Sequence, residues 1–301
     1  MTGCSLTPTS PFLDLPPESS DPASAMICVL PVPYDGTTSY QTGARFGPAA
    51  LIAASHQVEL FDESLGRETC RVGIHTCSPV RPNAAGPEAM IGDVRQRCEP
   101  LLEAGRFVAI IGGEHTVALG AIAAHIKRRS GRPFGVVQFD AHRDLRSSYD
   151  GTPWSHACVA ARMLDWQLPV IQIGVRAWSG EENDKAAAGA VTTLTARELF
   201  EGNAADLLSR ALKGFPEEVY LTFDLDALDP SIMPSTGTPE PGGLSWYQAL
   251  VLLEQLIGAR RIIGLDVVEL APIGGLVAPD LLAARLLYRM FGLIVRNSPL
   301  S

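Results

Sequence analysis

The sequence predicts an α/β fold in which helices cover both faces of a central parallel sheet. Short apolar runs alternate with longer helical patterns along the chain, which is typical of such a sheet. The short runs are rich in Val and Ile and almost continuously apolar, as strands buried on both faces should be. With 301 residues, 46% of them hydrophobic, the chain can bury a large core. One domain is the economical interpretation.

The same patterns place the individual elements. Strands are expected over residues 26–32, 106–113, 134–141, 169–176, 217–226 and 260–270. Helices are expected over residues 48–61, 87–103, 116–129, 244–257 and 279–293. Residues 1–25 are rich in Pro and Ser, which predicts an N-terminal arm that is flexible or draped over the surface. The single domain would then span residues 26–301.

Composition and charge argue against several classes of protein. No stretch approaches the roughly 18 consecutive apolar residues of a membrane span, and the N-terminus lacks the pattern of a secretory signal. The net charge of −9 argues against nucleic-acid binding and is compatible with a small cationic substrate. The six cysteines form no CxxC pair, which favours reduced thiols and a cytoplasmic protein. Spacing leaves open whether Cys70 and Cys77 approach each other.

Ionisable residues collect where four of the predicted strands end. The clusters are GGEH at 112–115, FDAHRD at 139–144, FDLD at 223–226 and DVVE at 266–269. Ligands of open parallel sheets lie beyond the carboxyl ends of the strands, so the clusters are expected to converge on one crevice. Taken alone, FDLD could be a surface turn, and GGEHT could be a phosphate loop, although it lacks GK[ST].

Six residues of these clusters predict a metal site: His115, Asp140, His142, Asp144, Asp224 and Asp226. Four buried carboxylates would repel one another and lose hydration, at a cost of several kcal/mol each, unless divalent cations neutralise them. Six ligands exceed what one metal normally uses, so two metals that share bridging carboxylates fit better. An oxygen-rich set without cysteine favours Mn²⁺, while Co²⁺, Ni²⁺ and Zn²⁺ stay open.

Together these motifs resemble the ureohydrolase family of arginases, agmatinases and their relatives. GGEH, FDAHRD, FDLDALDP followed by TGTPEPGGL, and DVVEL match the family in order and spacing, and YDGTTSYQTGARFGPAALI resembles its N-terminal signature. The resemblance extends from about residue 26 to the C-terminus. It implies a three-layer αβα fold, two Mn²⁺ ions per chain, hydrolysis of a guanidinium group to urea and an amine, and a homotrimer or homohexamer.

The resemblance also assigns ligands to each metal. One ion would be held by His115, Asp140, Asp144 and Asp224, and the other by His142, Asp140, Asp224 and Asp226, so that Asp140 and Asp224 bridge. Glu114 stands where many members have Asp, at a position that holds no metal.

Two further residues receive catalytic roles from the resemblance. His156, in PWSHACV, would deliver a proton to the leaving amine, and Glu269 would pair with the guanidinium group. Taken alone, His156 could be a helix-start residue and Glu269 a surface charge at the end of a strand.

The loop over residues 144–156 bears on the substrate. It looks like the agmatinase form and lacks the polar stretch with which arginases bind an α-amino acid, which favours agmatine, cleaved to putrescine and urea. Tyr149, Asp150 and Trp154 are the candidate contacts for the distal amine. Arg143 and Arg146 leave open a substrate that bears a carboxylate, such as guanidinobutyrate.

Other interpretations of the site stay open. Guanidinopropionate, arginine and formimidoylglutamate are alternative substrates within the family. A catalytically inactive, metal-binding subunit of an oligomer is an alternative of a different class, although the complete set of ligands argues against it.

Overall fold

The structure is a computed structural model that describes residues 10–189 and 191–297. Its centre is a sheet in which all neighbouring strands pair in parallel. In spatial order the strands are β4 (Ile74–Thr76), β1 (Ile27–Val32), β5 (Phe107–Gly112), β10 (Arg261–Val268), β9 (Glu218–Asp224), β6 (Gly135–Phe139), β7 (Val170–Val175) and β8 (Thr192–Thr195). A short hairpin of β2 (Phe61–Asp62) and β3 (Arg67–Glu68) lies outside this sheet.

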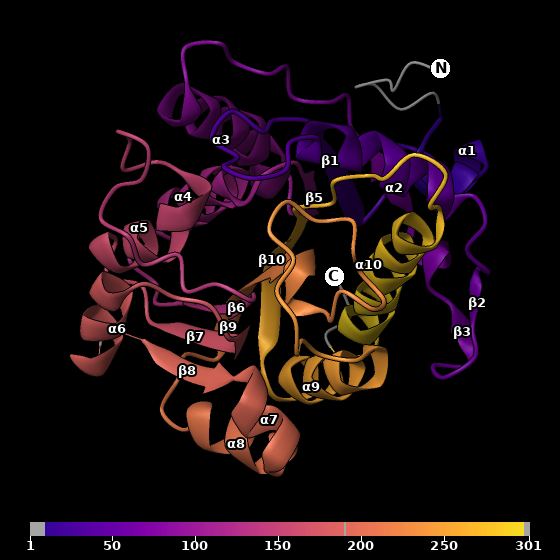
Figure 1. Cartoon of the computed structure of the whole chain (residues 1–301). Coiled ribbons are helices and arrows are strands. Elements are labelled where there is room, and N and C mark those ends of the chain that lie inside the picture. The colour runs from indigo at the N-terminus through magenta and orange to yellow at the C-terminus, as the bar shows by residue number, and fades with distance from the viewer. Residues whose placement is uncertain (1–9, 190, 298–301) are drawn as a thin grey trace.

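Helices cover both faces of the sheet (Figure 1). One face packs against α2 (Gly47–Ser55), α7 (Ala196–Glu201), α8 (Ala204–Ala211), α9 (Trp246–Ala259) and α10 (Ala278–Asn297). The other packs against α3 (Pro87–Glu103), α4 (Ala118–Arg129) and α5 (Val159–Asp165). Successive side chains of a strand alternate between the two cores, because a strand presents its residues to opposite faces: Val29 lies in the first core and Cys28 in the second. The predicted α/β architecture with three layers is confirmed.

The six predicted strands match observed strands closely, but the sequence analysis did not identify β4 and β8. These two are short edge strands that are only partly buried, so they lack the continuous apolar run of the central strands. The predicted helix over residues 48–61 ends at Ser55, and the one over 279–293 extends to Asn297. Two short helices, α1 (Pro17–Ser20) and α6 (Gly180–Ala187), complete the set of described α-helices.

Part of the expected N-terminal arm packs into the core. The Phe12 side chain is fully buried, and its ring lies edge-on to Phe291 with centroids 6.1 Å apart. The Leu13 amide donates a 2.7 Å hydrogen bond to Ser55 Oγ. Residues 11–15 therefore differ from the flexible or draped arm expected over 1–25, because their apolar side chains bury against α2 and α10. Residues 1–9 lie outside the described range.

Two expectations from composition can be compared with the described residues. None of their helices is both long and apolar enough to cross a membrane. Cys28, Cys70, Cys77, Cys98 and Cys158 are free and buried, so Cys70 and Cys77 are not joined in a disulfide. Cys4 lies outside the described residues.

Candidate metal centre and active site

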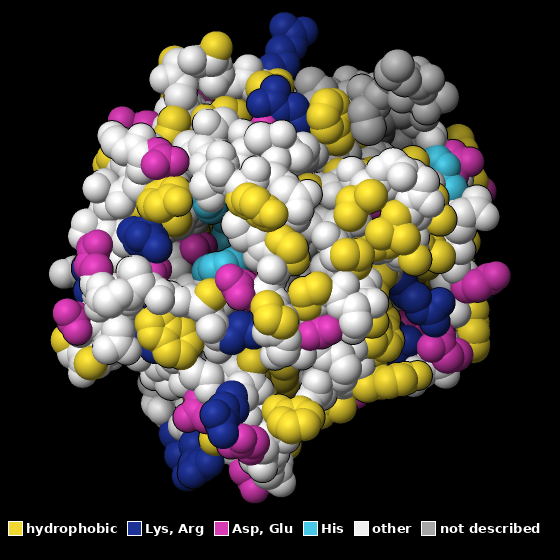
Figure 2. Space-filling model, viewed as in Figure 1, with side chains coloured by type: hydrophobic (Ala, Val, Ile, Leu, Met, Phe, Trp, Pro, Cys, Tyr) yellow, Lys and Arg dark blue, Asp and Glu magenta, His cyan; other side chains and the backbone are white. Residues whose placement is uncertain are grey.

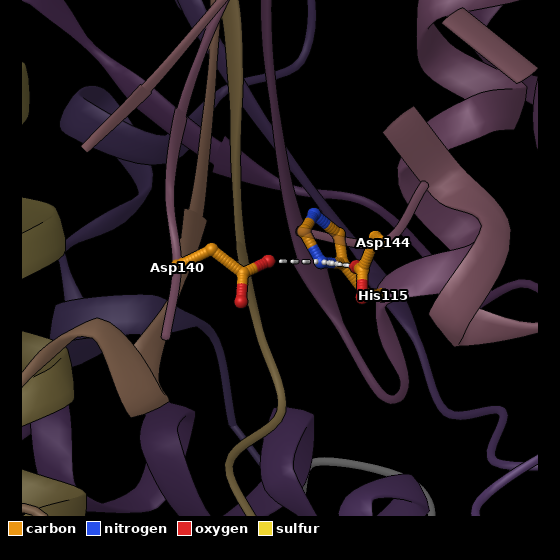
Figure 3. Close-up of side chains that lie close together, drawn as sticks. All are labelled: His115, Asp140 and Asp144. Carbon is orange, nitrogen blue, oxygen red and sulfur yellow. Dashed lines mark ion pairs between the residues drawn. The ribbon is translucent and has the colours of Figure 1, made fainter. Parts of the chain in front are cut away.

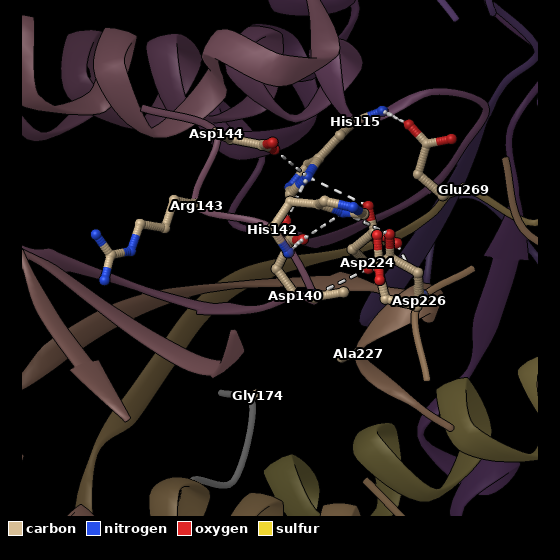
Figure 4. A network of polar contacts seen from close by, with 12 residues as sticks. His115, Asp140, His142, Arg143, Asp144, Gly174, Asp224, Asp226, Ala227 and Glu269 are labelled. Carbon is tan, nitrogen blue, oxygen red and sulfur yellow. Dashed lines mark hydrogen bonds and ion pairs between the residues drawn. The ribbon is translucent and has the colours of Figure 1, made fainter. Parts of the chain in front are cut away.

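The four ionisable clusters lie on four adjacent strands at the centre of the sheet. β5 and β6 follow each other along the chain, yet β10 and β9 lie between them. This change in strand order opens a crevice beyond the carboxyl ends of the strands. His115 begins the 3₁₀ helix η4 (His115–Val117) after β5, Asp140 follows β6, Asp224 ends β9, and Glu269 follows β10. Figure 4 shows these side chains pointing toward one another.

The first group of potential metal ligands comprises His115, Asp140 and Asp144. His115 Nδ1 lies 3.1 Å from Asp140 Oδ2 and 3.2 Å from Asp144 Oδ2 (Figure 3). Asp224 approaches the same nitrogen, with its Oδ2 at 3.5 Å. All four residues are buried.

The second group comprises Asp140, His142 and Asp226. His142 Nδ1 lies 2.9 Å from Asp226 Oδ2 and 3.6 Å from Asp140 Oδ1. Asp140 thus presents one carboxylate oxygen to His115 and the other to His142. A carboxylate in this position can bridge two cations.

Hydrogen bonding prepares His115 to bind a cation. Thr222 Oγ1 donates its only hydrogen to Asp266 Oδ1 at 2.6 Å, so it must accept from His115 Nε2, which is 2.8 Å away. In the neutral imidazole this contact makes Nδ1 the nitrogen without a hydrogen, facing the carboxylates, as a ligating histidine requires. Nδ1 is indeed buried without a hydrogen-bond partner, although carboxylate oxygens surround it.

The charges of the site also fit a bound cation. Burial, followed by the charges of Asp226, Asp140 and Glu269, raises the pKa of Asp224 well above its usual value. The ionised carboxylates are therefore unfavourable together, and a divalent cation among them would offset their repulsion. An orphaned imidazole nitrogen and an oxygen-rich donor set both match a divalent metal.

The backbone is strained at two of the site residues. Asp144 has φ 52° and Glu269 has φ 67°, a left-handed conformation that costs a non-glycine residue of the order of 1–3 kcal/mol. Glu269 is held there by its own side chain, since its Oε1 accepts the His115 amide at 2.6 Å. Strain of this kind is maintained at functional sites, where the surrounding contacts fix the residue.

His156 faces the same cavity from the start of η5 (His156–Cys158). Burial lowers the pKa of His156 to about 4. Its Nδ1 lies 3.2 Å from Thr37 Oγ1, which in turn donates to Glu114 Oε1 at 2.9 Å. The Tyr149 ring stands edge-on to the imidazole, with centroids 5.9 Å apart.

These residues line one cavity of about 330 Å³. Figure 2 shows histidine and acidic side chains inside a hollow on this face of the molecule. Its described lining includes His115, His142, Asp144, Asp224, Asp226, His156, Tyr149 and Glu269, together with Ser39, Arg146, Trp178, Glu182, Thr238 and Glu240. The cavity therefore combines five of the six potential ligands, all but Asp140, with the two residues expected to act in catalysis.

A sequence model of the arginase family matches residues 25–292. The chain belongs to the arginase family. It is 40% identical over 277 residues to an N(1)-aminopropylagmatine ureohydrolase from Synechocystis sp. The matched region makes up 90% of this chain and 89% of that relative. It is 32% identical over 273 residues to an agmatinase from Pyrococcus horikoshii, which covers 89% and 92%.

Solved structures of arginase-family proteins share the fold. The proclavaminate amidinohydrolase from Streptomyces clavuligerus superposes with a TM-score of 0.85 at 29% identity, over 96% of this chain and 97% of that one. The agmatine ureohydrolase of Thermoplasma volcanium superposes with a TM-score of 0.81 at 29% identity, over 90% of both chains. The predicted ureohydrolase family is thus confirmed, and the chain is a hydrolase of this family.

The three predicted substrate contacts lie at different places relative to the cavity, and their role stays a prediction. Tyr149 lines the cavity, but Asp150 and Trp154 are not among its described lining residues. Asp150 and Gly151 both have positive φ in the tight turn between Tyr149 and Thr152, and this turn leaves Asp150 exposed. Trp154 instead packs against the second core, with the Arg162 Cζ 5.8 Å from its ring centroid.

Of the two arginines that left a carboxylate-bearing substrate open, Arg143 is engaged outside the acidic cluster and Arg146 contacts other residues of the cavity lining. Arg143 points away from the acidic cluster (Figure 4). Its Cζ lies 4.3 Å from the Trp178 ring centroid, and its Nη1 donates to the Glu182 carbonyl at 3.2 Å. Arg146 does line the cavity, but its Nε is 3.8 Å from Glu182 Oε2 and its Cζ is 5.0 Å from the Tyr149 ring centroid.

Several cavity residues were not predicted from the sequence. Trp178 and Glu240 lie in loops outside the four strand-end clusters, so no motif identified them. Thr37 lies within the quoted N-terminal stretch, but a threonine in a loop carries no signal of its own. Asp266 belongs to the DVVE cluster, yet its contact with Thr222 depends on the pairing of β9 with β10.

Proposed function

We propose that this arginase-family chain hydrolyses a linear guanidino-polyamine to urea and an amine, with N(1)-aminopropylagmatine preferred to agmatine. The observation that carries the proposal is the acidic cavity, which Glu269 lines together with members of both groups of potential metal ligands. Among its described lining residues Arg146 is the one Arg or Lys, and it lies near Glu182. Such a cavity favours a substrate with several positive charges.

The choice between the two polyamines rests on the relatives. Relatives named N(1)-aminopropylagmatine ureohydrolase are 35–40% identical to this chain, whereas the agmatinase from Pyrococcus horikoshii is 32% identical. Trp178, 44% exposed, and Glu240 lie at the cavity, where an aromatic ring and a carboxylate would suit an additional ammonium group. Agmatine, which the loop over residues 144–156 favours, is the second candidate.

We propose His115, Asp140, Asp144 and Asp224 as the ligands of one Mn²⁺ ion, and His142, Asp140, Asp224 and Asp226 as those of a second. Together the two ions would supply the Lewis acidity that activates water near neutral pH. The geometry around Asp140 and the orphaned His115 Nδ1 support this arrangement.

Glu269 would orient the guanidinium group. Its Oε1 is anchored by the His115 amide, which leaves Oε2 and the second lone pair of Oε1 to accept guanidinium hydrogens. This contact would hold the guanidinium carbon at a fixed place in the cavity, so that attack by water becomes effectively intramolecular. His156 would carry a proton to the leaving amine nitrogen, since it faces the same cavity.

The test is urea release from N(1)-aminopropylagmatine, agmatine, arginine, guanidinobutyrate, guanidinopropionate and formimidoylglutamate, with saturating Mn²⁺ at one ionic strength. The expected result is the highest kcat/KM for N(1)-aminopropylagmatine. A higher value for agmatine would overturn the preference, and a higher value for guanidinobutyrate or arginine would overturn the polyamine class. Absence of urea from every compound would favour the inactive, metal-binding subunit.

A Glu240→Gln variant sharpens this test. If Glu240 pairs with the additional ammonium group, the variant should raise KM for N(1)-aminopropylagmatine more than for agmatine. Glu254→Gln is the matched control, because Glu254 lies on α9 and is not among the residues that line the cavity.

A further inference from the structure

The segment that follows β1 reaches over the end of β5 and contacts His156. Thr37 lies in this segment, and its amide donates a 2.6 Å hydrogen bond to Glu114 Oε2. The Glu114 amide in turn donates to the Tyr34 carbonyl at 2.8 Å. The Glu114 side chain is fully buried. The main chain of Glu114 is thus bonded to Tyr34 and its side chain to Thr37, so both parts of the residue are fixed.

The Thr37 hydroxyl already donates its hydrogen to Glu114. A hydroxyl has one hydrogen to donate and two lone pairs to accept with. Thr37 Oγ1 donates to Glu114 Oε1 at 2.9 Å and accepts the His156 amide at 3.0 Å. Its remaining lone pair faces His156 Nδ1 at 3.2 Å. Nδ1 is therefore the donor wherever that contact is a hydrogen bond, whereas Ser155 Oγ, also 3.2 Å from Nδ1, can either donate or accept.

We propose that Thr37 and Glu114 are positioning residues that fix His156 as the tautomer with its hydrogen on Nδ1 and a free Nε2. The inference rests on the proposed role of His156. In the neutral imidazole one nitrogen is a donor and the other an acceptor, so Nε2 is the nitrogen left for the cavity. It takes up the proton released as water adds to the guanidinium carbon and gives the same proton to the leaving amine nitrogen. The Nδ1 hydrogen stays on Nδ1 throughout.

The contact between Thr37 and Glu114 also explains why a glutamate is tolerated next to His115. Glu114 makes no contact with the potential metal ligands through its carboxylate; both of its oxygens are bonded to Thr37. The longer side chain therefore has a partner of its own, and it connects the loop after β1 to the catalytic side of the cavity.

The test compares Thr37→Val, which removes the hydroxyl at constant shape, with Thr37→Ser, which keeps it. Thr37→Val should lower kcat by about tenfold or more, with KM, metal content and thermal stability close to wild type. Thr37→Ser should recover most of the activity. The matched control is Thr38→Val, because the Thr38 hydroxyl bonds to the Asp35 carbonyl in the same loop. This variant should retain wild-type kcat.

A double-mutant cycle with His156→Ala decides whether Thr37 acts through the histidine. In the His156→Ala background, Thr37→Val should cause no further loss of kcat, because the residue that it positions is gone. An additive loss, wild-type kcat in Thr37→Val, or equal loss in Thr37→Ser would overturn the proposal. If Thr37→Val does not fold, Glu114→Gln takes its place in the same cycle. Wild-type activity in His156→Ala alone would instead overturn the proposed role of His156.

Discussion

Two threonine hydroxyls set the tautomers of two histidines in the site. Each hydroxyl donates its hydrogen to a carboxylate, so it can only accept from the histidine beside it. Thr222, between Asp266 and His115, leaves His115 Nδ1 free for a cation. Thr37 leaves His156 with a free Nε2. The partners are more than a hundred residues apart in the sequence, so no motif in the sequence predicts these contacts. They arise only in the folded chain, which brings these distant segments together.

At the same scale, Glu269→Gln should separate activity from stability. The variant should lower kcat/KM by at least about 100-fold, because a neutral amide no longer pairs with the guanidinium. It should also raise the Tm of the metal-free protein. Burial and the nearby Glu114 raise the pKa of Glu269 well above its usual value, so the ionised carboxylate destabilises the fold. A lower Tm in the metal-free variant would contradict this account.

A second residue-scale prediction concerns acid stability. Burial lowers the pKa of His125 to about 3, against about 6.5 for an exposed histidine. Its neutral form is therefore favoured in the folded protein, while the unfolded chain takes up a proton first. The free energy of unfolding should fall as the pH drops below about 6.5, by about 1.4 kcal/mol per pH unit, until the pH approaches the folded pKa.

Denaturant unfolding of wild type and His125→Gln at pH 7.5 and 5.5 measures the effect. The difference between the two pH values should be smaller in the variant by roughly 1–1.5 kcal/mol. An equal difference in both proteins would assign the acid sensitivity to other groups.

The sequence indicates the position of a residue at a strand end better than the position of a residue in a turn. His115, Asp140 and Asp224 follow directly from the ends of buried strands, so their convergence could be expected. Asp150 was expected at the substrate, but left-handed backbone in the turn that contains it leaves it exposed. Side-chain chemistry alone cannot indicate which way a turn residue points.

At the scale of elements, the single turn η6 (Leu225–Ala227) that follows β9 connects the two halves of the site. Asp226, in η6, contacts His142 and also accepts the Ala141 amide at 2.9 Å. Asp226→Ala should therefore lose one metal per chain and nearly all turnover while the sheet stays folded. Metal analysis and circular dichroism of the purified variant provide the measurement. Two metals per chain with full activity would contradict the two-metal assignment.

The elements themselves were predictable in proportion to their burial. α3 has the predicted bounds, Pro87–Glu103, because Pro87 begins the helix and an apolar face repeats along it. β8 is half exposed and lies at the sheet edge, and its Thr-rich sequence resembles a loop as much as a strand. Edge strands receive their structure from the neighbour with which they pair rather than from their own apolar pattern.

For the whole molecule, removal of metal should cost thermal stability. Asp140, Asp144, Asp224 and Asp226 lie close together in the interior, and cations between them would offset their repulsion. Dialysis against a chelator should lower the Tm, and Mn²⁺ should restore it. The control is Asp226→Ala, whose Tm should respond less to the chelator. An unchanged wild-type Tm would indicate that no bound cation contributes to stability.

The homotrimer or homohexamer implied by the family resemblance stays a prediction. Light scattering on the purified protein measures it directly. A monomer would contradict it.

The position of β10 has a consequence for the order in which the site is assembled during synthesis. β10 pairs with β5 on one side and β9 on the other, so the half of the sheet that carries His115 and the half that carries the aspartates are joined only through it. Along the chain this strand follows all other strands of the sheet, so the ribosome makes it after them. A nascent chain that stops before β10 would already hold Asp140, His142, Asp224 and Asp226 at the ends of the paired strands β6 and β9, whereas His115 would join them only once β10 has been made.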